Sequence, residues 1–535
     1  MADTKREIER KYESDESGLP DLTGIAGVAS VIDKGVAHLD ATYYDTADER
    51  LAASSITLRR RTGGADQGWH LKFPVAPGVR DEIQAPLSDS LPDTLAGLIR
   101  SRVRDAELVP VVRLRSARDL RDLLDAAGRL LAEVSVDAVR AQRLTGGDGE
   151  AQWTEIEVEL ADGVEPAFLD KVEKRLRKAG VRPSASASKL ARALSETGSK
   201  RSSSKSSRSS KSLNASQASS SEAPKAPKAS GKKAAKKARA AQEQPVTAGD
   251  HVLVYLRAQR DAIVALDPAV RQDLPDSVHS MRVATRRMRG TLKSYGGILD
   301  RAVTDPIGEE LKWLAGELGV DRDREVLTER LTAALDQVPD TLVLGPVATR
   351  LSRWASESHG GARARLIGVL DSARHLALLD TLDALVADPP LLDAAGKEPG
   401  KVIARAVRKD FGKVSALVGQ ALELPPGVDR DVAVHEARKK TKRTRYAAEA
   451  AVPALGAPAK GLVKSMKSLQ SLLGDHQDSV MARLALRELS AVAHAAGESA
   501  FTYGLLYGRE ESRAVAVEAE LPGFWAGIRD GADGL

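Results

Sequence analysis

Cysteine is absent from all 535 residues, and aromatic residues make up only 3% of the chain. The lack of thiols excludes structural disulfides, thiol catalysis and cysteine-ligated zinc. The scarcity of aromatic rings leaves no evident platform on which bases could stack, so a nucleic-acid-binding function ranks low. Because no run of eighteen uncharged apolar residues occurs, we expect no membrane span. The first residues, Met1 to Glu7, carry charges where a signal peptide needs apolar residues, and we therefore expect a cytoplasmic protein.

A segment rich in Ser, Ala, Lys, Arg and Pro covers residues 199–245 and lacks apolar periodicity. This composition predicts a disordered basic linker between a domain at 1–198 and another at 246–535. Residues 200–243 hold 12 Lys or Arg and 2 acidic residues, so the rest of the chain carries a net charge of −5. The linker could contact nucleic acid only non-specifically. Polyanion binding by the folded domains must come from basic residues gathered on particular faces.

Before the linker, short stretches such as 7–11, 56–61 and 155–160 alternate polar and apolar residues. A period of two predicts β-strands, with the charges of each strand on one face. Glu7, Glu9 and Lys11 would then share one side of a strand. The same alternation places three carboxylates on one side of another strand, namely Glu155, Glu157 and Glu159.

Carboxylates at this spacing repel one another unless they are solvated or share a hard divalent cation, which commonly also binds phosphates. Further strands carry donors that suit phosphate oxygens. These basic residues are Arg59, Arg61, Lys72, Arg113, Arg115 and Arg118. A barrel lined by both sets would hold a metal beside a polyanionic substrate. The alternative is a half-exposed sheet with surface salt bridges.

After the linker the sequence predicts long amphipathic helices and almost no strands, from about 246 to 530. It also contains a repeat, because Val278–Arg289 matches Val434–Arg445. Downstream, Leu318-Gly319 is followed by an equivalent Leu473-Gly474 at nearly the same offset. Two elements that recur in the same order predict two related helical bundles.

Each repeat places a stripe of cations on one face of a helix, at steps of three and four residues. The two stripes are His279, Arg282, Arg286, Arg289 and Lys293, and His435, Arg438, Lys442 and Arg445. Solvated helix faces normally interleave both signs of charge, and these stripes contain no acidic residue, which favours anion binding. For His279 and His435, helix packing and phosphate contact both remain open.

Residues 1–198 resemble the CYTH family of triphosphate tunnel metalloenzymes, whose mark is the ExExK strand seen at Glu7-Ile8-Glu9-Arg10-Lys11. Supporting motifs follow in order at Tyr43–Thr46, Leu58–Arg61, Trp69–Lys72, Ala132–Val134 with Asp137, Glu157–Glu159 and Ser188–Ala191. The resemblance implies an eight-stranded antiparallel barrel with a tunnel, and hydrolysis or rearrangement of triphosphates with Mg²⁺ or Mn²⁺. His70 stands where relatives often place Thr, a difference that bears on substrate preference.

The resemblance also implies roles for individual residues. Catalytic roles fall to Glu7, Glu9, Lys11, Glu157 and Glu159. The metal ligands would be Glu7, Glu9, Asp137, Glu157 and Glu159. Phosphates would be bound by Lys11, Arg59, Arg61, Lys72, Arg113, Arg115, Arg118 and Lys189.

Residues from about 246 to 530 resemble the CHAD family of conserved-histidine α-helical domains. The resemblance rests on Val278–Arg287, on Leu318-Gly319 with Arg322-Asp323, and on Leu473–Asp478. It implies two four-helix bundles with a basic groove that binds inorganic polyphosphate through the two stripes. A further basic helix face is assigned to the same role and comprises Arg405, Arg408, Lys409 and Lys413.

The sequence thus predicts a multidomain α+β protein, with an eight-stranded barrel and two repeated four-helix bundles. The function we favour is metal-dependent hydrolysis of inorganic triphosphate or short polyphosphate, with polyphosphate held by the helical domain on cytoplasmic granules. One alternative is a non-catalytic polyphosphate-binding protein. Others are a hydrolase of thiamine triphosphate or nucleotides, and an adenylate cyclase. The choice of substrate and metal and the oligomeric state stay open at this point.

Overall fold

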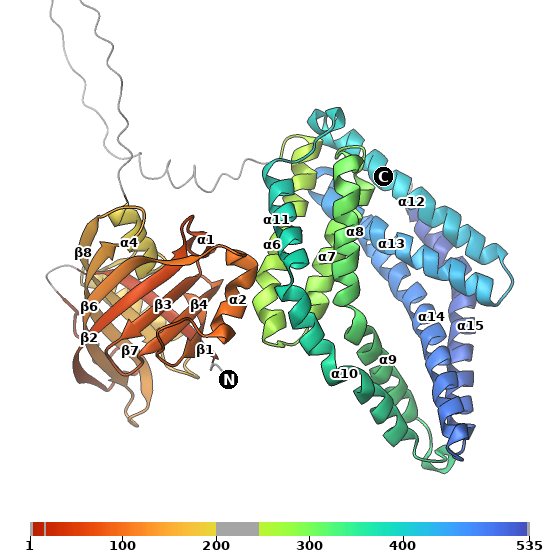
Figure 1. Cartoon of the computed structure of the whole chain (residues 1–535), viewed down its shortest axis with the longest axis horizontal. Helices are drawn as coiled ribbons and strands as arrows, with labels where there is room; N and C mark the ends of the chain where they lie inside the picture. Colours follow the sequence, from red (N-terminus) through yellow and green to blue (C-terminus); the bar gives the residue numbers. More distant parts are fainter. Residues whose placement is uncertain (1–3, 15–17, 199–244, 532–535) are drawn as a thin grey trace, which may run out of the picture. The chain divides into compact units, whose positions relative to one another are not determined.

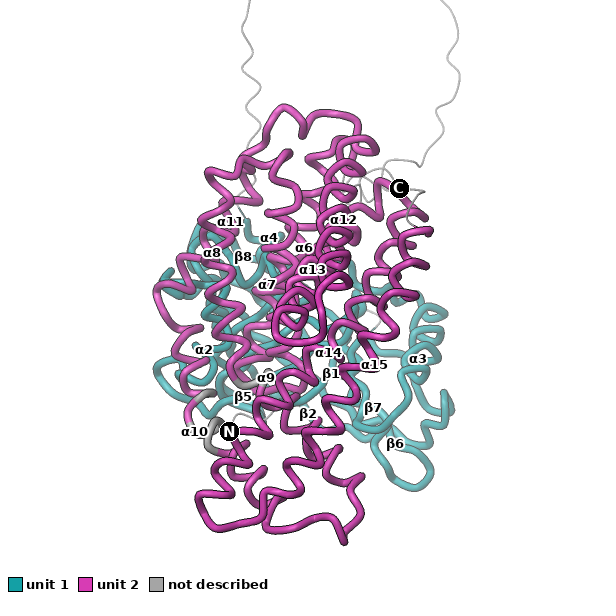
Figure 2. Tube along the Cα trace, turned by 90° about the vertical axis from the view of Figure 1, so that its right-hand side faces the viewer, with its two compact units in different colours: residues 1–223 teal, residues 224–535 magenta. Residues whose placement is uncertain are grey.

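The computed structural model describes residues 4–14, 18–198 and 245–531, without the side chains of 321–323, 357–360 and 362. The chain divides into two compact units between Ala223 and Pro224, shown in teal and magenta in Figure 2. This division falls inside the predicted linker, of which residues 199–244 lie outside the described residues, so the linker stays a prediction. Among the residues described, no helix has both the length and the hydropathy needed to cross a membrane.

The N-terminal unit is a closed antiparallel barrel of eight strands, which confirms the predicted fold (Figure 1). The strands are β1 (Thr4–Glu13), β2 (Ser30–Thr46), β3 (Thr57–Thr62), β4 (Gly68–Ala76), β5 (Val79–Ala85), β6 (Leu108–Leu124), β7 (Leu130–Arg143) and β8 (Glu150–Leu160). Their order around the barrel is β5-β4-β3-β2-β6-β7-β8-β1. Residues 4–8 of β1 pair with β5 and residues 9–13 pair with β8, which closes the barrel. A two-residue strand, β9 (Arg182–Pro183), pairs with the end of β1.

Apolar residues on the outward faces of the strands are covered by helices. Ile156 and Val158 of β8 pack against α3 (Ala167–Lys178), and Leu58 of β3 packs in a cluster with α1 (Arg50–Ala53) and α2 (Asp93–Val103). The fourth helix, α4 (Lys189–Thr197), instead packs on the inward-facing residues of β2, β6 and β7 and so fills one end of the barrel. Strand alternation therefore sends the apolar residues under the helices and the charged residues inward.

Over the described residues 245–531, the regular structure of the C-terminal unit is helical apart from one isolated bridge between Leu299 and Leu391. Its helices are α6 (Ala248–Arg271), α7 (Ser277–Ser294), α8 (Arg301–Glu317), α9 (Val320–Leu335), α10 (Val347–Asp371), α11 (Ala373–Ala387), α12 (Pro399–Glu423), α13 (Val428–Leu455), α14 (Ala457–Ala495) and α15 (Phe501–Gly531). Two short 3-10 helices lie at Asp340–Leu342 and Asp393–Gly396. The capping box of Thr247 and Asp250 illustrates why these helices begin where they do, because it satisfies the first amides of α6.

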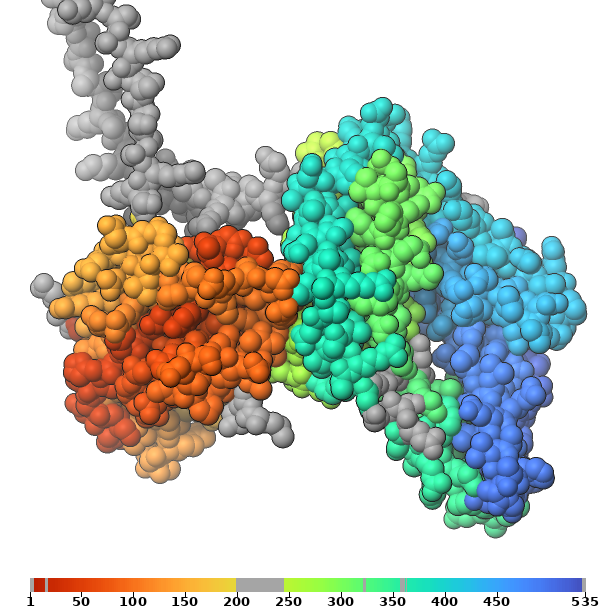
Figure 3. All heavy atoms as spheres, in the orientation of Figure 1, coloured from red at the N-terminus to blue at the C-terminus, as the bar shows by residue number. Residues whose placement is uncertain are grey.

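The two repeats form two bundles that share a core. α6, α7, α8 and α11 contact one another, and α12, α13, α14 and α15 form the second set, in which Phe411 meets Trp525. One hydrophobic cluster contains residues of both sets. A separate cluster joins α9 and the start of α10 to the end of α14 and the start of α15. Figure 3 shows these last segments, in green and blue, together at one end of the helical unit.

The related helices α7 and α13 meet each other directly, at equivalent positions of the repeat. A Cβ at Gly290 would lie 3.2 Å from Cδ2 of Tyr446, the residue that matches Gly290 in the second repeat. The two helices therefore cross at the same position of the repeat. The two basic stripes are thereby brought to the same region of the helical unit.

Candidate functional site

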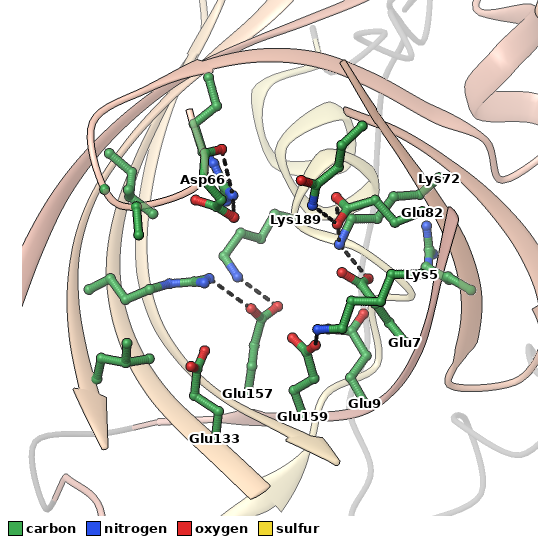
Figure 4. A pocket seen from close by; sticks show the side chains of 18 of the residues that line it. Lys5, Glu7, Glu9, Asp66, Lys72, Glu82, Glu133, Glu157, Glu159 and Lys189 are labelled. Atoms are coloured by element: carbon green, nitrogen blue, oxygen red, sulfur yellow. Dashed lines mark hydrogen bonds and ion pairs between the residues drawn. The ribbon is translucent and has the colours of Figure 1, made fainter. Parts of the chain in front are cut away.

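A cavity of about 470 Å³ lies inside the barrel and is lined by residues from all eight strands and from α4 (Figure 4). The alternation of the strands directs Glu7, Glu9 and Lys11 of β1 into it, together with Glu157 and Glu159 of β8. Arg59 and Arg61 of β3, Lys72 of β4, Arg118 of β6 and Lys189 of α4 also line this tunnel. Most side chains predicted for the substrate and metal sites are thus in one place.

Carboxylates occupy one side of the tunnel, as Figure 4 shows for Glu133, Glu157, Glu159, Glu9 and Glu7. They come from β7, β8 and β1, which are neighbours in the barrel. Glu159 pairs in register with Glu9 on one side and with Glu133 on the other. Like charges directly opposite each other on adjacent strands are destabilising, so positive charge beside these carboxylates stabilises this wall.

Cations occupy the opposite part of the wall, on β4, β3 and β6. The Nε atoms of Arg59 and Arg61 are buried and have no hydrogen-bond partner among the described residues. Arg59 otherwise makes only long contacts, from Nη1 to the Tyr43 hydroxyl at 3.4 Å and from Nη2 to Oε1 of Glu82 at 3.7 Å. Leaving buried guanidinium donors without acceptors costs free energy. This cost indicates that an anionic ligand supplies the missing acceptors.

Two lysines pair with carboxylates inside the tunnel. Nζ of Lys72 lies 2.5 Å from Oε2 of Glu7 and 3.3 Å from Oε1 of Glu82. Lys11 contacts both Glu9, at 3.0 Å, and Glu157. These pairs hold the walls in a defined geometry in which each cation already faces a carboxylate.

The tunnel shifts the acidities of its own groups. Burial raises the pKa of Glu7 to about 7. Lys72 offsets this rise only in part, and the nearby Glu82 adds to it. Burial and Glu159 likewise raise the pKa of Glu133. Burial alone would also raise the pKa of Glu157, but Lys11 and Lys189 hold it well below its usual range. Glu157, near Lys189, is therefore charge-compensated, and Glu133, beside Glu159, is less so.

The carboxylates around Lys189 form a second group, which consists of Asp137, Glu155 and Glu157. Nζ of Lys189 lies 2.9 Å from Asp137, 2.8 Å from Glu155 and 2.6 Å from Glu157, so an ammonium already stands where a metal ion would. Arg118 donates to both oxygens of Asp137 at 2.7 Å. This group anchors α4 in the barrel.

In the helical unit, four basic side chains of the two stripes converge, and we call them the four-cation cluster. They are Arg282 and Arg286 of α7 and Arg438 and Lys442 of α13. Burial lowers the pKa of Lys442 to about 7, and the charges of the three arginines contribute to the shift. Asp478 is an acidic neighbour, with Oδ1 4.0 Å from Nη2 of Arg438. Cations gathered this closely repel one another unless an anion joins them.

Comparison with known proteins identifies the family to which the chain belongs. Residues 5–194 match the CYTH domain and residues 254–487 match the CHAD domain. Protein MT2285 of Mycobacterium tuberculosis (strain CDC 1551 / Oshkosh) is 36% identical over 531 residues, which cover 96% of this chain and 94% of that protein. The chain belongs to the proteins that join a CYTH domain to a CHAD domain.

Solved structures are similar to parts of the chain at lower identity. PptA from Streptomyces chartreusis is 22% identical with a TM-score of 0.45, and covers 52% of this chain and 99% of its own. The CHAD domain from the plant Ricinus communis is 23% identical with a TM-score of 0.43, and covers 54% of this chain and 93% of its own.

The CYTH domain departs from the sequence prediction at three residues. Arg113 and Arg115 point away from the tunnel and pair with Asp40 on the outside of the barrel, at 2.6 and 3.4 Å. Arg118 points inward, because an odd step along a strand reverses the face. Asp137 is buried beneath Arg118 and Lys189 and is not part of the tunnel lining.

Other tunnel residues were not singled out from the sequence as site residues, chiefly Glu82 of β5 and Glu133 of β7. Glu82 accepts from Gln84 at 2.7 Å and lies 2.9 Å from Nδ1 of His70. A signal existed, since Arg80, Glu82 and Gln84 lie at alternate positions of one strand, as Glu7, Glu9 and Lys11 do in the ExExK strand.

In the CHAD domain the stripes divide into two groups. Arg289 donates to the carbonyl oxygen of Gly308 at 3.2 Å, and Lys293 lies 3.6 Å from Glu309. Arg445 pairs with Glu449 at 3.2 Å and lies over the ring of Tyr446. These three cations are engaged with the protein and are separate from the four-cation cluster.

The remaining predicted polyphosphate-binding residues are not members of the four-cation cluster. His279 is exposed, whereas Nδ1 of His435 lies 2.6 Å from Oε1 of Gln477. Arg405, Arg408 and Lys409 are exposed on α12, and Lys413 lies 3.7 Å from Asp410. The side chains of Arg322 and Asp323 lie outside the described residues.

A further polar group in the CHAD domain is structural in character. His476 is fully buried, and its Nε2 lies 3.2 Å from Glu518 and 3.4 Å from Asp431. Arg430 pairs with Glu518 at 2.7 Å and Arg483 with Asp431 at 3.3 Å. Because the arginines balance both carboxylates, this network ties α13, α14 and α15 together without calling for a metal ion.

Proposed function

We propose that the CYTH domain hydrolyses inorganic triphosphate or short polyphosphate, and that the CHAD domain binds polyphosphate. Membership of the family supports a triphosphate tunnel enzyme with a polyphosphate-related function. The observation that carries the proposal is the pair of buried, unpartnered Nε donors of Arg59 and Arg61, which face a wall of carboxylates in one closed tunnel. Phosphate oxygens are the acceptors that suit such guanidinium forks.

The donor set of the acidic wall fits a divalent cation. Glu9, Glu133 and Glu159 offer oxygens from three adjacent strands in register, and Glu159 pairs with the exposed Lys5 at 2.6 Å. These three residues with Glu7 would hold the ion, whereas Asp137 and Glu157 serve Lys189 and Arg118. When bound, Mg²⁺ or Mn²⁺ would neutralise phosphate charge and lower the pKa of a water molecule.

The basic wall would bind and orient the substrate. Arg59 and Arg61 lie two residues apart on β3, so they present adjacent donors along the tunnel. Lys72 faces the same space from β4. Fixed donors of this kind stabilise charge that develops on phosphate oxygens during transfer to water, and the reaction needs no side-chain nucleophile.

The lining favours an inorganic substrate over a nucleotide. Of the described residues that line the tunnel, Tyr43 is the one aromatic side chain, and its hydroxyl faces Arg59. A base or thiazole ring would therefore find little surface on which to stack. Charged groups dominate the remaining wall, which matches a substrate made of phosphate alone.

Phosphate release from tripolyphosphate, long-chain polyphosphate, thiamine triphosphate and ATP, each with Mg²⁺ and with Mn²⁺, tests this proposal. We expect tripolyphosphate to be preferred and excess EDTA to abolish turnover. Glu159→Gln should lower the rate by roughly two orders of magnitude, since it removes charge from the metal site at constant size. The exposed Glu165→Gln serves as a matched control. Full activity in EDTA, or in Glu159→Gln, would show that the acidic wall holds no catalytic ion.

Polyphosphate binding by the CHAD domain is supported by the four-cation cluster, in which burial and the charges of the three arginines lower the pKa of Lys442. Arg286→Ala with Lys442→Ala should weaken polyphosphate binding and make it less dependent on salt, by analogy with counterion release from nucleic acids. Lys401→Ala with Lys460→Ala removes the same charge from exposed positions and is the control. Equal affinities of the two double variants would place the polyphosphate site elsewhere.

The predicted linker would let both domains act on one polymer. A flexible segment of the 44 residues 200–243 has a root-mean-square reach of roughly 35 to 40 Å. We expect long-chain polyphosphate at low concentration to be hydrolysed faster by the intact chain than by an equimolar mixture of its two halves. Equal rates would remove the tethering proposal. Binding of this kind would also direct the protein to polyphosphate granules in the cytoplasm.

A further inference from the structure

Two glycines stand at equivalent places beside the four-cation cluster. Gly319 follows Arg282 by thirty-seven residues, and Gly474 follows Arg438 by thirty-six. Each glycine comes directly after a leucine that is buried in the shared core, Leu318 or Leu473. The leucines account for packing, but the glycines beside them need a separate explanation.

Backbone conformation does not require glycine at either position. Gly319 has φ −103° and ψ −14°, in the right-handed region that any residue adopts. Gly474 lies inside α14, where glycine costs about 1 kcal/mol of helix stability relative to alanine. A reason for glycine at these positions must therefore be sought in the space around them.

That space is occupied by the guanidinium groups of the cluster. A Cβ on Gly319 would lie 2.4 Å from Nη2, 2.6 Å from Cζ and 2.9 Å from Nε of Arg282. A Cβ on Gly474 would lie 3.4 Å from both Nε and Nη2 of Arg438. Each guanidinium thus rests against a helix surface that carries no side chain.

We infer that Gly319 and Gly474 are positioning residues, which seat Arg282 and Arg438 so that their guanidinium groups converge on Lys442. This inference rests on the proposed polyphosphate binding by the CHAD domain. An arginine side chain has several rotatable bonds and would otherwise leave a region of like charge. The seat, together with the hydrogen bond from Nε of Arg282 to the carbonyl oxygen of Ala315 at 3.3 Å, holds it in place before the anion arrives.

Gly319 and Gly474 differ in how closely the guanidinium group approaches them, so substitutions at one position serve as controls for the other. Alanine at 319 would overlap the guanidinium of Arg282 and must displace it, whereas alanine at 474 would only touch Arg438 at ordinary contact distance. We expect Gly319→Ala to weaken polyphosphate binding about tenfold, the effect of losing one charged hydrogen bond. Gly474→Ala should change affinity less than about twofold and raise the melting temperature, as a helix-favouring substitution. A larger residue, as in Gly474→Leu, should weaken binding as Gly319→Ala does.

The deciding experiment is a double-mutant cycle in the full-length chain, with labelled polyphosphate as the probe and thermal unfolding as the check on folding. If Gly319 acts through Arg282, Gly319→Ala should have no further effect on affinity in an Arg282→Ala background. An equal loss in both backgrounds would mean that the substitution disturbs α9 and would overturn the inference. So would unchanged affinity in Gly319→Ala when Arg282→Ala binds more weakly. Wild-type affinity in Arg282→Ala, or no binding by the wild type, would instead overturn the proposed polyphosphate site and the inference with it.

Discussion

Lys442 offers a pH-dependent test of the four-cation cluster. Burial and the charges of Arg438, Arg286 and Arg282 lower its pKa to about 7, and Asp478 acts in the opposite sense. A bound polyanion would favour the protonated form, so binding should be coupled to uptake of a proton. The sign follows: affinity is highest below pH 7 and falls as the pH rises through the pKa of the free protein.

The size of the effect follows from the charged fraction of Lys442. With a pKa of about 7, that fraction falls from about one half at pH 7.0 to about 3% at pH 8.5, and affinity should fall by about 16-fold. Lys442→Arg keeps its charge throughout this range and should be nearly independent of pH. Lys439→Arg, at an exposed position on the same helix, should retain the wild-type profile.

Isothermal titration with polyphosphate at pH 7.0, 7.5, 8.0 and 8.5 measures both the affinity and, in buffers of different ionisation enthalpy, the proton uptake. His435, whose pKa is lowered mainly by burial, is already neutral over this range and should not contribute. A flat wild-type profile, or the same decline in Lys442→Arg, would refute the reasoning that like charges and burial control this lysine.

Three further outcomes follow from the structure. Arg443→Ala should destabilise the CHAD domain by about 3 to 5 kcal/mol in denaturant unfolding, because it leaves the buried Asp410 without its paired guanidinium. Wild-type stability of this variant would contradict the prediction. The rate of triphosphate hydrolysis should rise with pH through about 7 as Glu7 ionises, and Glu7→Gln should abolish this limb of the pH–rate profile. Asp66→Asn should lower the KM for tripolyphosphate by roughly tenfold, since it releases Arg61 from an internal carboxylate; an unchanged KM would show that the pair does not compete with substrate.

The inward and outward faces of the CYTH barrel follow from counting along the strands. The alternation correctly places Glu7 and Glu9 on one face, and the structure brings that face into the tunnel. The same count would have separated Arg113 and Arg115 from Arg118, because the step from 115 to 118 is odd. Grouping these arginines by proximity in sequence was the error, and it needed no structure to correct.

Other features of the tunnel depend on how the barrel closes. Glu133 and Glu9 both flank Glu159 only because β8 lies between β7 and β1. The cage around Lys189 likewise requires α4 to enter one end of the barrel. Sequence spacing shows which residues share a strand face, but strand order decides which faces meet.

In the CHAD domain, helical periodicity predicted the two stripes but not their division. Arg443 lies off the stripe, yet it pairs with the buried carboxylate of Asp410 on α12. Conversely, Arg445 on the stripe is drawn to Glu449 and Tyr446. Helical periodicity already places Arg445 one turn before Glu449, whereas the pairing of Arg443 with Asp410 depends on how α12 packs against α13.

The sequence by itself determined the two domains, the alternating strands, the internal repeat and the kinds of charge that the sites carry. These are local properties, because strand and helix periodicities and composition are expressed over a few residues. Only the tertiary structure decided which charges meet. Arg59 is left short of acceptors by the arrangement of the barrel wall, and Lys442 meets Arg282 because α7 and α13 cross at Gly290. The interaction between such charges depends on distances between segments that are far apart in the chain. The spacing of residues along one segment does not reveal those distances.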